Sequence, residues 1–354
     1  TALPGPWDPR SCIPPEFSTH ASFSQGSSEE QRYHPSMNQL ESLRQHTVVV
    51  ADTGEIDLIE EHRPQDATTN PSLIAKAFTN PAYGDLIARA RERAQGEVPS
   101  KRVEAFLDHL FVVFGCRILE LVPGRVSTEV LAGLSFDVNA SLDKAHRLIE
   151  LYAAEGIDRE RVLIKLATTW EGVEASRQLE QEGIHCNMTL LFGLVQAVAA
   201  AEAKATLISP FVGRIFDWHK RDRGVDDIPI AEDPGVQSVA DIYTYLKKFG
   251  YPIQVMGASF RKADQITALA GCDLLTIAPN LLDELAGREG EIACALSSAA
   301  AAESDVERLP ADEKSFRWYL NEEAMATEKL AQGIRSFHAD TLSLQAKLQT
   351  MLEG

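Results

Sequence analysis

Positive charge is scarce in this chain. Its 354 residues include 34 lysines and arginines against 52 aspartates and glutamates, which gives a formal net charge of −18. Such a balance argues against a nucleic-acid partner and against binding to an anionic membrane surface. An anionic ligand would therefore need a local cluster of basic residues.

Cysteine pairs and long apolar runs are also lacking. The five cysteines are widely spaced, with no CxxC pair and no Cys/His spacing that suits zinc. Scattered thiols in an odd number favour a reducing, cytosol-like compartment. No apolar run reaches the length of a membrane span. We therefore expect a cytoplasmic protein without a metal site.

Residues 1–36 differ in composition from the remainder. They are rich in proline, serine and glycine and show no hydrophobic periodicity. We predict that residues 1–36 form a disordered extension or a targeting or cloning remnant. Met37 resembles a natural start, and residues 37–354 are predicted to form the folded domain.

From residue 45 onward, short apolar strands alternate with helical patterns. This rhythm is typical of a parallel α/β sheet, and eight strands over about 240 residues predict a (β/α)8 TIM barrel. An open doubly wound sheet is the alternative, but no glycine-rich phosphate fingerprint follows the first strand. The predicted strands are 47–52, 66–70, 126–130, 162–167, 185–191, 206–211, 252–259 and 273–278. Helices are expected at 103–122, around 142–152 and at 236–249, and additional C-terminal helices at 313–352 should pack outside the barrel.

The predicted strand 162–167 contains one charged residue, Lys165, among apolar neighbours. Alternation places Leu163, Lys165 and Ala167 on one face. An ammonium in such surroundings loses hydration, which favours the neutral amine and makes Lys165 a candidate for Schiff-base chemistry. A lysine at a strand end that reaches out to solvent is the competing interpretation.

Polar side chains recur in the same phase on the other strands. The active site of a TIM barrel lies at the carboxyl ends of its strands, so side chains on these faces should converge there. Asp52 and Glu129 are carboxylates able to transfer protons to and from an imine, although they could also simply neutralise Lys165. The neutral or apolar members of the set are Thr68, Asn70, Asn187, Thr189, Ser209 and Phe211, and strand seven is predicted to turn Ile253, Val255, Gly257 and Ser259 inward. Polar members of this set suit sugar hydroxyls.

Two arginines follow strand ends directly. Arg214 comes just after strand six, and Arg261 just after strand seven, beside Ser259. Guanidinium groups suit phosphate oxygens, so we expect a phosphate site here rather than ordinary surface ion pairs. His185 and His219 are assigned no catalytic role.

Seven stretches closely resemble the transaldolase family, in its longer bacterial and animal form. They are Thr47–Gly54, Pro64–Leu73, Val122–Val130, Leu163–Leu166, His185–Phe192, Leu207–Arg214 and Val255–Arg261. The resemblance runs from about Met37 to the C-terminus. It departs from the usual family pattern at Leu131–Gly133, at Gly193 and at Lys262.

The resemblance implies a role for each site residue. Lys165 would form the Schiff base, Asp52 would be the acid/base of carbon–carbon cleavage, and Glu129 and Thr189 would hold a proton-relaying water. Binding of the three-carbon unit and of the phosphate of the sugar substrate would fall to Thr68, Asn70, Asn187, Ser209, Phe211, Arg214, Ser259 and Arg261. No cofactor is expected, and the protein should be a homodimer.

The implied reaction is transfer of dihydroxyacetone from sedoheptulose 7-phosphate to glyceraldehyde 3-phosphate. A fructose 6-phosphate aldolase that releases dihydroxyacetone is the main alternative. Those relatives tend to carry Gln and Tyr where this chain has Glu129 and Phe211, which favours transfer. A non-enzymatic binding protein is the third possibility, but an amine flanked by two carboxylates argues against it.

Overall fold

Eight parallel strands close into a barrel in the computed structural model, which describes residues 37–353. Each strand pairs with its sequence neighbour, and the last pairs with the first, with Thr276 opposite Val50. The strands are β1 (Val48–Asp52), β2 (Asp66–Thr68), β3 (Val126–Glu129), β4 (Val162–Ala167), β5 (Cys186–Leu191), β6 (Leu207–Pro210), β7 (Gln254–Gly257) and β8 (Leu274–Ile277). The predicted TIM barrel is confirmed, whereas the predicted extension at residues 1–36 lies outside the described residues.

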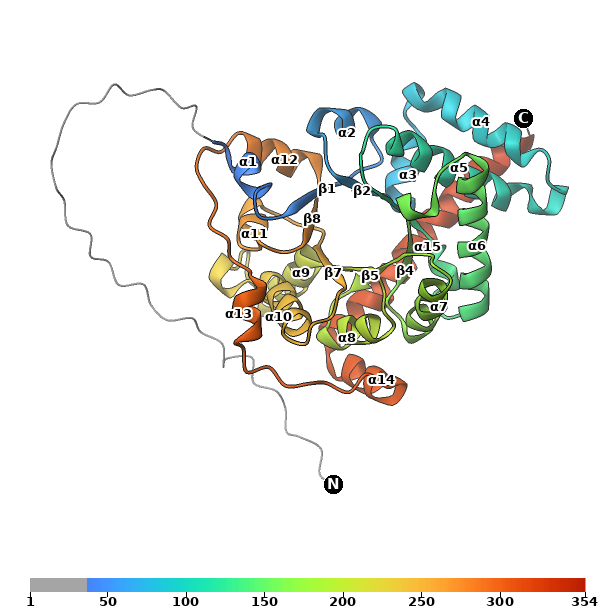
Figure 1. Cartoon of the computed structure of the whole chain (residues 1–354). Helices are drawn as coiled ribbons and strands as arrows, with labels where there is room; N and C mark the ends of the chain where they lie inside the picture. Colours follow the sequence, from blue (N-terminus) through green and yellow to red (C-terminus); the bar gives the residue numbers. More distant parts are fainter. Residues whose placement is uncertain (1–36, 354) are drawn as a thin grey trace, which may run out of the picture. The chain divides into compact units, whose positions relative to one another are not determined.

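Helices surround the barrel and join its strands (Figure 1). The α-helices are α1 (Gln39–Leu43), α2 (Ile56–His62), α3 (Pro71–Ala77), α4 (Gly84–Ala94), α5 (Arg102–Leu119), α6 (Val138–Ala154), α7 (Trp170–Gln181), α8 (Leu194–Glu202), α9 (Val212–Arg223), α10 (Pro234–Lys248), α11 (Ala263–Thr267), α12 (Pro279–Ala286), α13 (Ser298–Ala302), α14 (Glu313–Glu322) and α15 (Ala324–Glu353). The helices predicted at 103–122, 142–152 and 236–249 correspond to α5, α6 and α10. No helix among residues 37–353 is both long enough and apolar enough to cross a bilayer.

Alternation along the strands separates two apolar cores. Outward side chains such as Ile164 and Met188 pack against the helices in one large cluster. A small cluster fills the barrel interior below the site: Val50, Leu163, Leu207, Met256 and Leu274. Burial on both faces explains why these strands are apolar apart from the polar positions at their carboxyl ends.

Strand seven has the opposite phase to the one predicted. Met256 faces the barrel interior, and Val255 belongs to the outer core. Gly257 also faces outward, since a Cβ there would lie 2.8 Å from Leu275. Ser259 still reaches the cavity because the strand ends at Gly257 and the backbone turns at Ser259, which has φ 62°. A left-handed residue after the strand breaks the alternation on which the prediction relied.

The C-terminal region is two helices, separated by the extended residue Glu323. It lies outside the strands as predicted, but α15 also contacts β5, α3, α5 and α9 around the carboxyl end of the barrel. Its residues Met325, Leu330, Ile334 and Phe337 pack with Phe211 in a third cluster. Phe337 thereby becomes part of the lining of the central cavity.

Candidate active site

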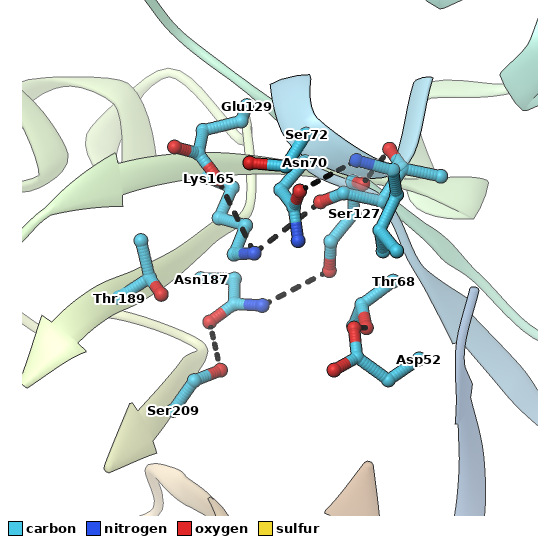
Figure 2. Close-up of polar contacts among 12 residues, drawn as sticks. Asp52, Thr68, Asn70, Ser72, Ser127, Glu129, Lys165, Asn187, Thr189 and Ser209 are labelled. Carbon is cyan, nitrogen blue, oxygen red and sulfur yellow. Dashed lines mark hydrogen bonds and ion pairs between the residues drawn. The ribbon is translucent and has the colours of Figure 1, made fainter. Parts of the chain in front are cut away.

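Lys165 is buried near the carboxyl end of β4, with only 5% of its surface exposed. Its Nζ lies 3.2 Å from Glu129 Oε2 on β3 and donates to the Thr69 carbonyl at 3.3 Å. Register explains the first contact, because Glu129 and Lys165 are paired residues on adjacent parallel strands. The amine therefore faces the barrel interior beside one carboxylate (Figure 2).

Asp52, the second carboxylate, lies at the end of β1 and belongs to a separate hydrogen-bonded group. Thr68 Oγ1 donates to Asp52 Oδ1 at 3.1 Å and lies 2.9 Å from Thr276 Oγ1. An ionised Asp52 can only accept, so Thr68 donates to it and Thr276 donates to Thr68. The hydrogen bond from Thr68 holds the Asp52 carboxylate in position (Figure 2).

A chain of neutral groups crosses the opposite wall of the site. Ser209 Oγ donates to Asn187 Oδ1 at 2.6 Å, and Asn187 Nδ2 donates to Ser127 Oγ at 3.0 Å. Asn70 caps α3 by accepting from the Leu73 amide at 3.0 Å. Because that bond uses Oδ1, the Asn70 amide group remains available as a donor to a ligand.

Two buried oxygen atoms near the amine have unused hydrogen-bonding capacity. Neither Thr189 Oγ1 nor Glu129 Oε2 makes a hydrogen bond of good geometry within residues 37–353. Both side chains are at most 4% exposed. Buried polar atoms normally have partners. The unpartnered Thr189 hydroxyl, and a Glu129 Oε2 that meets only the Lys165 ammonium, therefore point to a site that binds a polar ligand.

Burial dominates the electrostatics of both carboxyl groups. It raises the pKa of Asp52, and the charge of Lys165 and the Thr68 hydrogen bond oppose this only partly. Burial also raises the pKa of Glu129, against the opposing charge of Lys165. Both carboxyl groups therefore hold a proton more readily than exposed ones, which suits acid/base work.

The two predicted phosphate arginines differ in their surroundings. Arg214 is largely buried, with its guanidinium 4.8 Å from the centre of the Phe211 ring and 5.2 Å from that of Phe337. Burial and the charge of Arg261 lower its pKa. Within residues 37–353, no carboxylate lies within ion-pair distance of Arg214.

Arg261 is more exposed and already has an anionic partner. Its Nε and Nη2 donate to Asp217 Oδ2 at 3.0 and 2.7 Å, and its Nη1 lies 3.3 Å from Ser259 Oγ. The pair Arg214 and Arg261 thus supplies the local positive charge that an acidic protein needs for an anionic ligand.

One cavity joins most of the predicted residues. Its lining includes the predicted Asp52, Thr68, Asn70, Lys165, Thr189, Ser209, Phe211, Arg214 and Ser259. Glu129 and Asn187 contact this set directly, and Arg261 lies beside Ser259. The structure therefore brings all twelve predicted residues to one end of the barrel.

The sequence interpretation missed four lining residues: Met256, Ala258, Thr276 and Phe337. Thr276 follows the same alternation on β8 and could have been found by extending the face analysis to that strand. Met256 was assigned to the wrong face, and Phe337 comes from α15, for which no local pattern predicts contact with the cavity. His185 lies at the other end of the barrel, bound to Glu160 and Thr206, in agreement with its non-catalytic assignment.

Comparison with known proteins agrees with this geometry. The sequence profile of the family described as Transaldolase/Fructose-6-phosphate aldolase matches residues 49–348. The chain belongs to this family. It is also 54% identical over 314 residues to a protein named Transaldolase from Protochlamydia amoebophila (strain UWE25), which covers 88% of this chain and 98% of that relative.

The departures from the transaldolase family pattern have local explanations. A Cβ on Gly193 would lie 2.6 Å from Glu323 Oε2, and one on Gly133 would lie 3.0 Å from His338 Nδ1. These small residues leave room for side chains of the C-terminal region. Lys262 donates to Asp227 Oδ1 at 3.0 Å and to the Ile228 carbonyl at 3.1 Å, so its ammonium is already engaged.

Proposed function

We propose that this protein transfers a dihydroxyacetone unit from sedoheptulose 7-phosphate to glyceraldehyde 3-phosphate, giving erythrose 4-phosphate and fructose 6-phosphate. The observation that carries the proposal is the buried Lys165 amine, 3.2 Å from Glu129 at the carboxyl end of a TIM barrel. This reaction belongs to the non-oxidative pentose phosphate pathway. Membership of the family of transaldolases and fructose 6-phosphate aldolases supports it, as does the 54% identity to a protein named Transaldolase.

In the first step, Lys165 attacks the ketone carbon of the donor. Its ammonium must first lose a proton, and Glu129 is the nearest carboxylate. The resulting carbinolamine loses water to form an imine, which requires a proton on the departing hydroxyl. We assign Glu129 and Thr189, which lie on the strands that flank β4, to a water that carries this proton. Their unused buried oxygen atoms support the assignment.

In the second step, the carbon–carbon bond of the imine breaks. Asp52 takes the proton from the donor hydroxyl, the aldehyde leaves, and the bonding electrons remain on the three-carbon unit as an enamine. Asp52 belongs to a different hydrogen-bonded group from Glu129, so each carboxyl group can serve a different proton transfer of the reaction. Attack of the enamine on an acceptor aldehyde then reverses these events.

We assign Asn70, Asn187 and Ser209 to the hydroxyl groups of the three-carbon unit, with Thr68 and Phe211 completing the wall. The phosphate would bind Arg214, Ser259 and Arg261. Support comes from the unused Asn70 amide group and from the absence of a carboxylate beside Arg214 in the described part of the chain.

Transfer is favoured over release because Phe211 offers no proton to the enamine. Its ring lines the cavity, stacked edge-on against Phe192 with centroids 5.3 Å apart. Release of dihydroxyacetone needs protonation of the enamine carbon and hydrolysis of the imine, whereas transfer needs only an aldehyde. Phe211→Tyr adds a hydroxyl at this place and should raise release relative to transfer.

The decisive experiment traps the intermediate. Incubation with fructose 6-phosphate and borohydride should attach a three-carbon adduct to Lys165, located by peptide mass spectrometry. Donor alone should release little free dihydroxyacetone, and erythrose 4-phosphate should restore turnover. An adduct on another lysine would contradict the assignment of Lys165, and rapid release without acceptor would favour the aldolase reaction.

We further propose that the protein is a cytoplasmic homodimer that acts without a cofactor. Free thiols at Cys116, Cys186, Cys272 and Cys294 support a reducing compartment. Light scattering coupled to size-exclusion chromatography tests the dimer. Full activity after exhaustive treatment with chelator would agree with a cofactor-free reaction.

A further inference from the structure

The structure describes three buried lysines, and one of them has no carboxylate partner. Lys144 is 8% exposed and binds Glu104 and Asp108 at 2.6 and 2.9 Å. Lys165 lies beside Glu129. Lys329 is also 8% exposed, yet among residues 37–353 its Nζ has only the neutral Gln332 Oε1, at 3.0 Å. Buried ammonium groups are rare unless paired, so the counter-charge of Lys329 has to come from elsewhere.

Lys329 borders a groove of about 420 Å³ between α9 and α15. Arg221 on α9 and Arg335 on α15 line the same groove, as do Trp218, Glu328 and Gln332. None of the groove residues lines the cavity that contains Lys165. The groove is therefore a separate hollow, although Trp218 is one helical turn beyond Arg214 on α9.

Charge in the groove is out of balance. Three cationic side chains face a single carboxylate, Glu328, which already accepts from the Trp218 indole at 2.7 Å and lies 3.7 Å from Arg221. Arg335 has no carboxylate within ion-pair distance in the described part of the chain. Excess positive charge is unexpected in a chain with a net charge of −18. Burial and the charges of Arg221, Arg214 and Arg261 lower the pKa of Lys329, and the charge of Asp217 opposes this only partly.

We propose that the groove between α9 and α15 is a second anion site, which binds a small phosphorylated molecule outside the reaction cavity. The Lys329 ammonium would meet the phosphate as a buried point charge, and the guanidinium groups of Arg221 and Arg335 would contact its oxygens from the rim. The Trp218 ring offers an apolar surface for the body of the ligand. Such a ligand would occupy the protein together with the substrate.

Inorganic phosphate is the probe for this site. The chain has four tryptophans, so the indole signals of protein carrying 15N-labelled tryptophan can be followed individually, with Trp218→Phe giving the assignment. Phosphate should shift the Trp218 signal saturably, because an arriving anion repels the Glu328 carboxylate that the indole contacts. Sodium chloride at equal ionic strength should not do so.

Variants connect the shift to the groove. Lys329→Gln should weaken phosphate binding roughly tenfold, the usual size of one lost charge-assisted contact. Arg221→Gln, at an exposed position, should also weaken it and serves if Lys329→Gln does not fold. Lys314→Gln removes an exposed positive charge from α14 and should leave binding unchanged.

Arg261→Met separates the groove from the reaction cavity. It removes a proposed substrate contact, so persistence of the Trp218 shift supports a second site. Loss of the shift in this variant would place the phosphate in the reaction cavity and overturn the proposal. A shift that does not saturate, that chloride reproduces, or that survives both Lys329→Gln and Arg221→Gln would overturn it as well.

Discussion

Both ends of the barrel contain charged and polar side chains. Those at the amino end have partners within the protein, whereas several at the carboxyl end have hydrogen-bonding capacity left over. At the amino end, Asp66 accepts from the Arg125 amide at 2.9 Å and from its Nε and Nη2 at 3.2 and 3.0 Å. The same guanidinium also donates to Gln254 Oε1 at 2.9 Å. Nearby, Glu180 accepts from the amides of Cys186 and Thr206 at 2.8 and 2.6 Å. Asp66 and Arg125 therefore bind each other, and Glu180 binds backbone amides, so these charged groups all have partners within the protein.

At the carboxyl end, hydrogen-bonding capacity is left over. Thr189 Oγ1 and Glu129 Oε2 make no hydrogen bond of good geometry within residues 37–353, and Arg214 packs on aromatic rings rather than on a carboxylate. Satisfied charges at the amino end hold the strands together, whereas the unsatisfied groups at the carboxyl end can bind a ligand. Conservative substitutions at the two ends should therefore affect different measurements, stability at one end and activity at the other.

The largest expected effect comes from Lys165→Met. Without a primary amine no imine can form, so turnover should fall on the order of 10⁴-fold or more and borohydride trapping should disappear. Lys144→Met is the matched control, because it replaces another buried lysine, which lies on α6 and pairs with Glu104 and Asp108 on α5. It should reduce thermal stability but preserve trapping. If folded Lys144→Met also failed to form the trapped adduct, the contrast between the two lysines would be contradicted.

Glu129→Gln should slow imine formation by about 10²- to 10⁴-fold, the usual contribution of a general acid/base group. Single-turnover trapping of the adduct measures this step. Because burial raises the pKa of Glu129 and Asp52, kcat/KM should decline on the acid side above the ordinary carboxyl pKa of about 4.3. Glu160→Gln, an exposed carboxylate at the amino end, should change neither quantity.

The raised pKa values should also make the free energy of unfolding depend on pH, in the direction opposite to that of activity. Between the ordinary and the raised pKa of Glu129, the folded protein binds more protons than the unfolded chain, so the free energy of unfolding falls as the pH rises. Glu129→Gln should reduce this slope. Denaturant titrations at several pH values would measure it, and an unchanged slope would contradict the raised pKa.

Arg214→Met and Arg261→Met should each weaken binding of phosphorylated substrates by roughly 2–4 kcal/mol, through loss of a charge-assisted contact. The Michaelis constants for phosphorylated and unphosphorylated acceptor aldehydes, compared side by side, measure the effect. Only the phosphorylated acceptor should bind more weakly. Unchanged constants in both variants would mean that the phosphate binds elsewhere.

Arg125→Met makes the same arginine-to-methionine change at the amino end of the barrel. It leaves the Asp66 carboxylate without its guanidinium and should lower the free energy of unfolding by about 2–3 kcal/mol, given that Arg125 is partly exposed. Denaturant titration measures this loss. Substrate binding should stay at the native level, and a raised Michaelis constant in the folded variant would weaken the division between the two ends.

The smallest effect is expected from Thr276→Val. It removes the donor to Thr68, which should cost about 1 kcal/mol and loosen the hydrogen bond between Thr68 and Asp52. Since that bond lowers the pKa of Asp52, the acid limb of kcat/KM should move to higher pH. Thr276→Ser keeps the hydroxyl and should restore the native profile. A fall in activity without any shift of the acid limb would indicate a purely structural role.

Sequence alone determined the eight strands and most of the site. Period-two alternation is a local property, so Asp52, Glu129, Lys165, Asn187 and Ser209 could be assigned to one face from the printed residues. The carboxyl-end rule for TIM barrels then placed these side chains together. The existence of α5 and α10 followed equally from local periodicity, although the predicted bounds, 103–122 and 236–249, differ from Arg102–Leu119 and Pro234–Lys248.

Only the tertiary structure decided what depends on distant contacts. Closure of β8 on β1 brings Thr276 to Thr68, 208 residues away in the chain, and α15 brings Phe337 to the cavity from beyond the last strand. Ser259 reaches the cavity because β7 ends before it and its backbone is left-handed, whereas within β7 it is Met256 that faces inward. The lack of a carboxylate partner for Lys329 among residues 37–353 is likewise a property of the packed structure, because it depends on which side chains α9 brings to α15. Alternation fixes which way a side chain points along one strand, whereas packing between distant segments fixes what it meets.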